Sequence, residues 1–256
     1  MAQELYKNVV IIGASQGIGK ALAEEYASHG YNLVLLSRNV EAIKEIAGTL
    51  NSKGGKCYFK ECDVSDYESV RSGIEFANSS LETIDIAIIN AGMGSPEWMS
   101  SFRSSEFKRV VGTNTFGIAH CLEFLIPLMK AQGYGKIAGV SSLSDVRGYA
   151  GSSSYSASKG AASILLESAR VELKLLNIRV STVRPGFVKT EMTDKNEFWM
   201  PFLMNPDKAA RIIKRGIDRN KSVIQFPLFT VMATRIVKNL PNWIYDPLMR
   251  MSRKVK

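Results

Sequence analysis

A short apolar run that ends in a cluster of glycines constrains the fold of this chain more than any other feature. Residues 9–12 read Val-Val-Ile-Ile between polar residues and a glycine, which is typical of a strand buried on both faces. Residues 13–19 read Gly-Ala-Ser-Gln-Gly-Ile-Gly, and a helical pattern follows. A strand, a glycine turn and a helix N-terminus together favour a bound phosphate, because the backbone can approach it and the free N–H groups face it. The stretch therefore predicts a nucleotide site.

Strand and helix patterns alternate along the rest of the chain. Further strands are predicted at 32–36, 56–61, 84–89, 136–140, 178–183 and 222–226, with helices near 41–52, 67–79, 104–131, from 155 onward, at 207–219 and near 230–240. Repeated βα units imply an α/β fold, a Rossmann-like doubly wound parallel sheet of about seven strands with helices on both faces. We expect one dinucleotide-binding and catalytic domain over 1–256, with its core at 5–226. Its ligand should lie at the carboxyl ends of the strands.

The residues after the second predicted strand bear on the choice of cofactor. In dinucleotide folds an acid at this strand end binds the ribose of NAD, whereas an arginine pairs with the 2′-phosphate of NADP. Here the strand ends in Ser37 and Arg38 without an acid, so NADP is favoured over NAD. The alternative is an ordinary surface arginine.

Tyr155 and Lys159 stand four residues apart at the start of a predicted helix, so both side chains project from one face. A neighbouring ammonium favours the phenolate and should lower the tyrosine pKa, which suggests proton chemistry. The alternative is a solvated helix face. Ser142 follows the strand 136–140 at the expected ligand edge, and no nearby histidine could activate it, which disfavours a hydrolase. Asn114 inside the helix 104–131 indicates a kink or a water site.

Charge and composition are distributed unevenly. The net charge is +9, and from Lys208 onward twelve Lys and Arg stand against two acids. We expect residues 191–206, rich in Met, Phe and Trp, to form either a substrate lid or a packed segment. The basic, aromatic extension at 227–256 suits peripheral membrane contact or subunit packing. It contains no nucleic-acid recognition motif.

Cysteine usage and the N-terminus indicate the compartment. The three cysteines lack CxxC spacing, so neither a disulfide framework nor a metal site is predicted. The start of the chain lacks a signal-like apolar region, and no window approaches the ~20 apolar residues of a membrane span. We therefore expect a cytoplasmic protein.

Taken together, these motifs resemble the short-chain dehydrogenase/reductase family in its roughly 250-residue form with a YxxxK active site, from Asn8 to about Phe226. The resemblance implies the strand order 3-2-1-4-5-6-7 and a homodimer or homotetramer. It also implies reversible hydride transfer between NADP(H) and a carbonyl or alcohol. The family's catalytic set falls on Asn114, Ser142, Tyr155 and Lys159.

The resemblance assigns a role to each member of this set. Ser142 would bind the substrate oxygen, Tyr155 would donate the proton, and Lys159 would lower the tyrosine pKa and hold the nicotinamide ribose. Asn114 would anchor a water that relays protons. The implied cofactor residues are Gly13, Ser15, Gln16, Gly17, Ile18, Gly19, Ser37, Arg38, Asp63, Val64, Asn90, Ala91, Gly92, Tyr155, Lys159, Pro185, Gly186, Val188 and Thr190.

Two positions depart from the family pattern. Thr often precedes the first glycine and Asn often precedes the Asn-Ala-Gly motif, but here these positions are Ile12 and Ile89. We expect apolar packing to replace the missing hydrogen bonds. The apolar lid favours a lipophilic carbonyl substrate. The alternatives are a small polar or acyl-carrier-bound carbonyl, or a non-catalytic NADPH-sensing protein.

Overall fold

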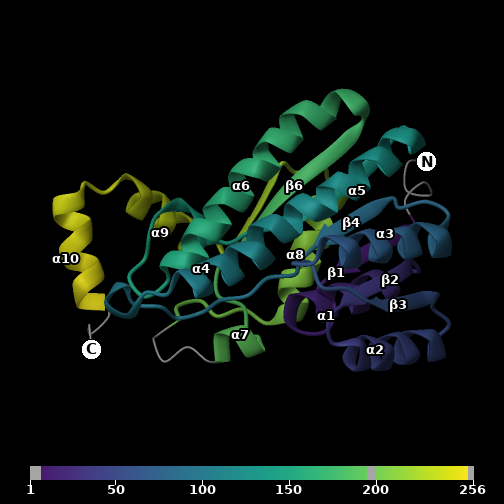
Figure 1. Ribbon diagram of the computed structural model, residues 1–256, viewed down its shortest axis with the longest axis horizontal. Coiled ribbons are helices and arrows are strands. Elements are labelled where there is room, and N and C mark those ends of the chain that lie inside the picture. Colours follow the sequence, from purple (N-terminus) through teal and green to yellow (C-terminus); the bar gives the residue numbers. More distant parts are fainter. Residues whose placement is uncertain (1–6, 195–199, 253–256) are drawn as a thin grey trace.

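A parallel sheet forms the centre of the computed structural model, which describes residues 7–194 and 200–252 (Figure 1). Its strands follow the order β3-β2-β1-β4-β5-β6-β7, so the predicted topology is confirmed. The strand bounds are β1 Asn8–Ile12, β2 Asn32–Ser37, β3 Cys57–Glu61, β4 Ile86–Ile89, β5 Gly135–Val140, β6 Ile178–Pro185 and β7 Val223–Phe226.

Helices cover both faces of this sheet. Their bounds are α1 Gly17–Ala27, α2 Val40–Ser52, α3 Tyr67–Leu81, α4 Ser104–Val111, α5 Gly117–Gln132, α6 Ser153–Leu173, α7 Glu191–Asp194, α8 Pro206–Asp218, α9 Leu228–Asn239 and α10 Asn242–Ser252. One apolar cluster joins the sheet to α1, α2 and α8, and a second joins its other face to α3, α5 and α6.

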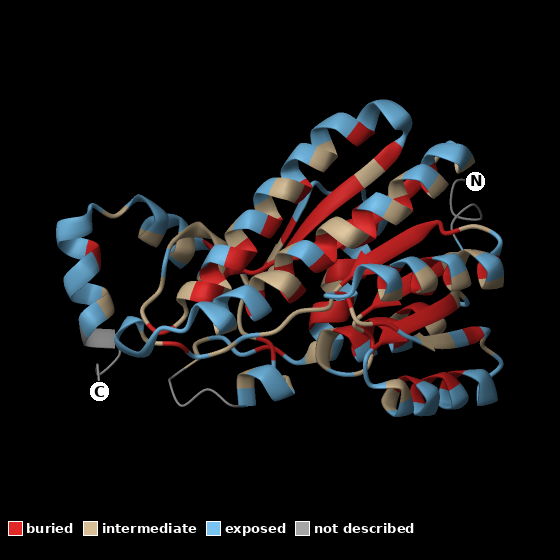
Figure 2. Ribbon diagram, in the orientation of Figure 1, coloured by how far each residue is buried: buried red, intermediate tan, exposed pale blue. Residues whose placement is uncertain are grey.

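The first strand shows why the apolar runs are continuous. Val9 and Ile11 belong to the cluster on one face, whereas Val10 and Ile12 belong to the cluster on the other. Successive side chains of a strand point to opposite faces, so a strand covered on both sides needs an apolar residue at every position. The buried strands stand out against the exposed outer sides of the helices in Figure 2.

Ile12 and Ile89 face each other across the β1–β4 pair. Both are almost fully buried and belong to the same apolar cluster, as the sequence predicts. The Ile12 carbonyl oxygen accepts the backbone N–H groups of Asn90 (2.8 Å) and Ala91 (2.9 Å), and the Asn90 amide donates to the Gly13 carbonyl oxygen (2.7 Å). Backbone groups and Asn90 therefore supply the polar support of the glycine turn.

The C-terminal helices α9 and α10 lie at the end of the molecule opposite α2 and β3 (Figure 1). The sequence predicts a helix near 230–240, and α9 begins two residues earlier. Within the described ranges, no helix is both long enough and apolar enough to span a bilayer.

Candidate functional site

A cleft runs along the carboxyl ends of β1, β2, β4, β5 and β6, where the sequence predicts the ligand. Most of the predicted cofactor and catalytic residues line it: Gly13, Ser15, Gln16, Gly17, Ile18, Ser37, Arg38, Val64, Asn90, Ala91, Gly92, Ser142, Tyr155, Lys159, Pro185, Gly186, Val188 and Thr190. The lining also includes Ser141 beside Ser142, Met192 and Thr193 of the predicted lid, and residues that the sequence did not indicate, namely Cys62, Thr113 and Val140. Gly19, Asp63 and Asn114 lie outside the lining.

The glycine turn has room only for glycine at its two ends. Gly13 has φ +86°, and a Cβ on it would lie 2.5 Å from the Ala91 nitrogen. A Cβ on Gly19 would lie 2.0 Å from the Gly13 carbonyl oxygen. Both distances are far shorter than a van der Waals contact, so neither position can hold a side chain. Gly19 lies beneath the turn and, without a side chain, allows the turn to close against α1. This open backbone at a helix N-terminus fits the pyrophosphate of a dinucleotide.

The end of the cleft at β2 carries hydroxyl groups and one cation. The Ser37 hydroxyl donates to the Ser15 hydroxyl oxygen (2.9 Å), and Arg38 beside it is exposed. Asp63 lies outside the lining but directly precedes Val64, which lines the cleft. Its Oδ1 accepts the backbone N–H (2.9 Å) and the hydroxyl (2.7 Å) of Ser65, so this carboxylate oxygen closes its own turn.

The other end of the cleft brings Ser142, Tyr155 and Lys159 together. Ser142 follows β5, and its hydroxyl oxygen accepts the Ser144 backbone N–H (3.1 Å). Tyr155 and Lys159 lie in the first turns of α6, and the Lys159 Nζ is 5.9 Å from the centroid of the tyrosine ring. The same Nζ donates to the Val140 carbonyl oxygen (2.8 Å). The two side chains thus face the cleft and not the solvent side of the helix.

The pKa of Tyr155 moves in the direction opposite to the sequence expectation. Burial raises the pKa of Tyr155, hydrogen bonding to Ser142 opposes this, and the carboxylate of Asp145 adds to it. Burial also lowers the pKa of Lys159 to about 8, against the opposing effect of Asp145. Desolvation is therefore the largest effect on the Tyr155 pKa, and the phenol is held in its neutral, proton-donating form at neutral pH.

Asp145 forms a buried acidic centre beneath these residues that the sequence did not indicate. Its carboxylate accepts the Ser163 hydroxyl (2.5 Å) and pairs with the guanidinium of Arg184. The Ser163 hydroxyl oxygen also lies 2.7 Å from that of Ser141, whose own hydroxyl donates to the Lys159 carbonyl oxygen (2.9 Å). The network joins the turn after β5, helix α6 and the end of β6.

Asn114 lies in a π-helical segment, Gly112–Phe116, that separates α4 from α5. Its Nδ2 donates to the Met93 carbonyl oxygen (2.8 Å) and the Ser158 hydroxyl (2.9 Å), and its Oδ1 accepts the Met93 N–H (2.8 Å). The predicted helix 104–131 is therefore interrupted at this asparagine, as single π turns often are at functional sites. Because both amide hydrogens are used, the side chain acts as an anchor between the loop after β4 and α6.

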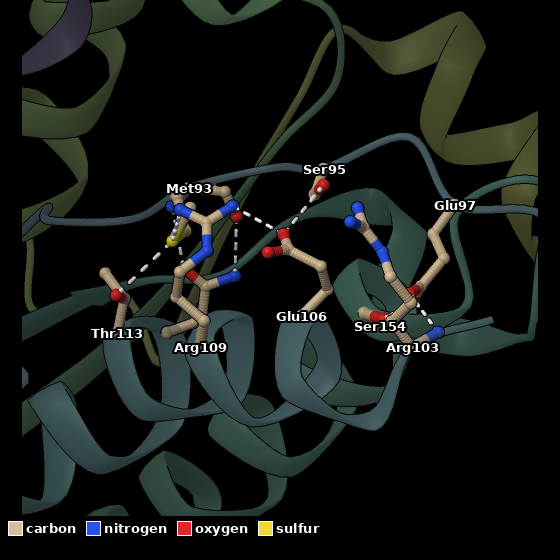
Figure 3. A network of polar contacts seen from close by, with 9 residues as sticks. Met93, Ser95, Glu97, Arg103, Glu106, Arg109, Thr113 and Ser154 are labelled. Carbon is tan, nitrogen blue, oxygen red and sulfur yellow. Dashed lines mark hydrogen bonds and ion pairs between the residues drawn. The ribbon is translucent and has the colours of Figure 1, made fainter. Parts of the chain in front are cut away.

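A second anchor of the same loop is Glu97, which is buried (Figure 3). Its carboxylate accepts the Ser154 hydroxyl (2.5 Å) and the Arg103 backbone N–H (3.0 Å). Ser154 directly precedes Tyr155, and a carboxylate is favoured near the N-terminus of α6. Glu97 therefore fixes the start of the helix that carries the tyrosine.

The predicted lid, 191–206, divides its apolar residues among three environments. Met192 in α7 lines the cleft, Met204 is buried in the core, and Phe202 is exposed. The predicted lid residues Phe198 and Trp199 lie outside the described residues. Met204 therefore fits the interpretation of a packed segment, and the lid stays a prediction that concerns Met192.

Arg147 ties the C-terminal helices to the turn that carries Ser142. Its guanidinium donates to the carbonyl oxygens of Val237 (3.1 Å) and Leu240 (2.6 Å) and to Oδ1 of Asn242 (2.6 Å), and it lies 3.7 Å from the ring centroid of Tyr245. A cation at the last carbonyls of α9 also complements the helix dipole. The extension therefore packs against the turn that carries Ser142.

Comparisons with known proteins agree with this geometry. A family model described as short chain dehydrogenase matches residues 7–200. An uncharacterized oxidoreductase of Myxococcus xanthus is 32% identical over 99% of this chain and 100% of its own length. The 3-oxoacyl-[acyl-carrier-protein] reductase FabG of Staphylococcus aureus is 29% identical over 75% of this chain and 78% of its own length. The structure of a 7α-hydroxysteroid dehydrogenase complexed with NADH and 7-oxo glycochenodeoxycholic acid superposes with a TM-score of 0.80. It is 26% identical and covers 86% of this chain and 92% of its own chain.

Proposed function

Because the chain belongs to the short-chain dehydrogenase/reductase family and is an oxidoreductase of that type, we propose that it uses NADP(H) to interconvert a lipophilic ketone or aldehyde and its alcohol. The observation that carries the proposal is the convergence of Ser142, Tyr155 and Lys159 at one end of a cleft whose other end is the glycine turn.

The residues of the cleft fit a nicotinamide dinucleotide. The backbone at Gly13 and Gly17 and the N-terminus of α1 would hold the pyrophosphate, and Arg38 would pair with the 2′-phosphate. Lys159 would hold the nicotinamide ribose, and the segment from Pro185 to Thr190 would hold the nicotinamide. When bound, the nicotinamide supplies or accepts the hydride.

In the reductive direction, the side chains supply the proton and stabilise charge. Ser142 donates a hydrogen bond to the substrate oxygen, and Tyr155 gives its phenolic proton to the alkoxide that develops there. Burial keeps this phenol protonated until the step occurs. The Lys159 ammonium then stabilises the phenolate that remains. Asn114 and Glu97 hold the loop after β4 and the start of α6 in place, so they act as positioning residues.

The lining beside Tyr155 supports an apolar substrate. A Cβ on Gly94 would lie 3.7 Å from the Met192 sulfur and 3.9 Å from the Tyr155 ring, so the methionine and the ring bound the same space. The similarity to FabG favours a second candidate substrate, an acyl-carrier-bound carbonyl. A screen of NADPH consumption over ketones and aldehydes of graded size and polarity separates the two. We expect kcat/KM to rise with apolar size, and a preference for acyl-carrier thioesters would favour the second candidate.

The cofactor preference is tested at Arg38. Arg38→Asp should weaken NADPH binding by roughly 10- to 100-fold, because it removes a charge-assisted contact to the 2′-phosphate, whereas NADH binding should change little. Fluorescence titration of both cofactors measures the two dissociation constants, and Arg38→Lys, which keeps the charge, should fall between wild type and Arg38→Asp. Equal losses for NADPH and NADH would remove Arg38 from the phosphate site.

A further inference from the structure

Helix α9 presents an apolar face to solvent. Its Val231 is buried, but Leu228, Phe229, Met232 and Ile236 on another side of the helix are between 53% and 69% exposed. At 100° per residue these four side chains fall within an arc of about 100°, so they form one stripe. Figure 2 shows this helix and α10 as the largely exposed end of the molecule. Large apolar side chains gathered in this way mark an interaction surface.

The stripe is extended by Phe202 from the segment after α7. The rings of Phe202 and Phe229 stack with their centroids 5.3 Å apart and their planes 19° apart. Phe202 is 57% exposed and has φ +58°, a left-handed conformation that is unfavourable for a bulky residue. The chain therefore holds an aromatic ring at the surface against its backbone preference. We call Phe202, Leu228, Phe229, Met232 and Ile236 the α9 face.

Basic residues accompany the α9 face. Arg235 and Lys238 lie exposed on α9, about 20° and about 80° beyond the Leu228 edge of the stripe on the helical wheel. Residues 227–256 together carry six Lys and Arg and one acid, Asp246. In α10, Trp243 is 76% exposed, and aromatic side chains of this kind favour the boundary between water and lipid. An apolar stripe with flanking cations fits an anionic lipid surface.

We propose that the α9 face is a docking surface that binds this protein to membranes rich in anionic lipid. A second copy of the chain fits less well, because a symmetric contact would bring the basic flanks of both copies together. An anionic bilayer instead attracts those flanks while it removes the apolar side chains from water.

The α9 face lies close to the cleft. A Cβ on Gly186, which lines the cleft, would lie 3.4 Å from the Thr230 Cγ2 in the first turn of α9. A protein docked through this face would therefore hold the cleft near the lipid surface. Docking does not require the reaction proposed above, so a binding measurement tests it separately.

Vesicle flotation of the full-length protein tests the proposal. We expect wild type to float with phosphatidylcholine vesicles that contain phosphatidylglycerol. With vesicles of pure phosphatidylcholine, the protein should remain in the bottom fraction while the vesicles rise. Phe229→Glu with Ile236→Glu should lower the partition coefficient by more than about tenfold, since it places two anions in the apolar stripe. Arg235→Glu with Lys238→Glu should remove the preference for the anionic vesicles.

The matched control is Leu175→Glu, which changes a 91% exposed leucine in the turn after α6 and should float like wild type. The thermal unfolding and NADPH affinity of each variant show whether it is folded. Absence of flotation by wild type, or equal flotation of wild type and the Phe229→Glu, Ile236→Glu variant, would overturn the proposal. If wild type does not float and that variant lowers the sedimentation coefficient, the α9 face is a contact between copies of the chain.

Discussion

Tyr155→Phe should lower kcat by roughly 10²- to 10⁴-fold while it leaves the dissociation constant of NADPH within a few-fold of wild type. The substitution removes one hydroxyl and keeps the ring beside the Lys159 ammonium and Met192. The loss should fall on kcat, because the phenolic proton is needed only as the alkoxide forms. Steady-state kinetics on the best substrate of the screen and fluorescence titration of NADPH measure the two quantities.

Tyr67→Phe provides the control for the tyrosine substitution. Tyr67 lies on α3, where its hydroxyl donates to Glu123 (2.7 Å), and it does not line the cleft. The Tyr67→Phe variant should therefore keep the kcat of wild type. Turnover near the wild-type level in Tyr155→Phe would mean that another group delivers the proton.

Lys159→Met should abolish turnover and yet stabilise the cofactor-free protein at pH 7. Burial lowers the pKa of Lys159 from 10.5 to about 8, so the folded state holds the charged form less favourably than the unfolded state does. A difference of this size corresponds to about 3 kcal/mol, from which loss of the hydrogen bond to the Val140 carbonyl oxygen subtracts. The methionine retains the apolar stem without the charge.

The stabilisation should depend on pH in a defined direction. Below about pH 8 both states carry the ammonium, and the folded state bears the full cost of its burial. Between about 8 and 10.5 the folded state has lost the proton while the unfolded state retains it, so wild type gains stability as pH rises. The difference in the free energy of unfolding between Lys159→Met and wild type should therefore shrink over this range.

Urea unfolding of both proteins at pH 7, 8, 9 and 10 measures this difference. Lys44→Met is the matched control, because Lys44 is exposed on α2 and its substitution should show no such trend. A Lys159→Met variant less stable than wild type at pH 7, or a difference that grows with pH, would contradict the account of a costly buried ammonium.

Local patterns predicted the parts of this molecule that depend on near neighbours in sequence. The strand, glycine turn and helix from Asn8 onward and the alternating burial of the strands follow from residue type and spacing. The placement of Tyr155 and Lys159 on one face of α6 also follows from their spacing, because four residues make about one helical turn.

Contacts between distant segments could not be predicted. Glu97 binds Ser154 and Asp145 pairs with Arg184, and no sequence spacing connects either pair. The predicted direction of the Tyr155 pKa shift was wrong for the same reason, because burial by surrounding segments raises this pKa. Asp63 follows its strand as predicted, but only the structure shows that Ser65 takes up its Oδ1.

The contacts of Arg147 change what removal of the C-terminal extension would mean. A chain shortened after Pro227 would lose the carbonyls of Val237 and Leu240 together with the ring of Tyr245, and would leave this guanidinium without those partners. The turn that carries Ser142 would then lose its outer support, so a shortened enzyme would fail even on a substrate dissolved in water. Point substitutions on the solvent side of α9 leave that support intact, and they are the cleaner way to separate lipid attachment from catalysis.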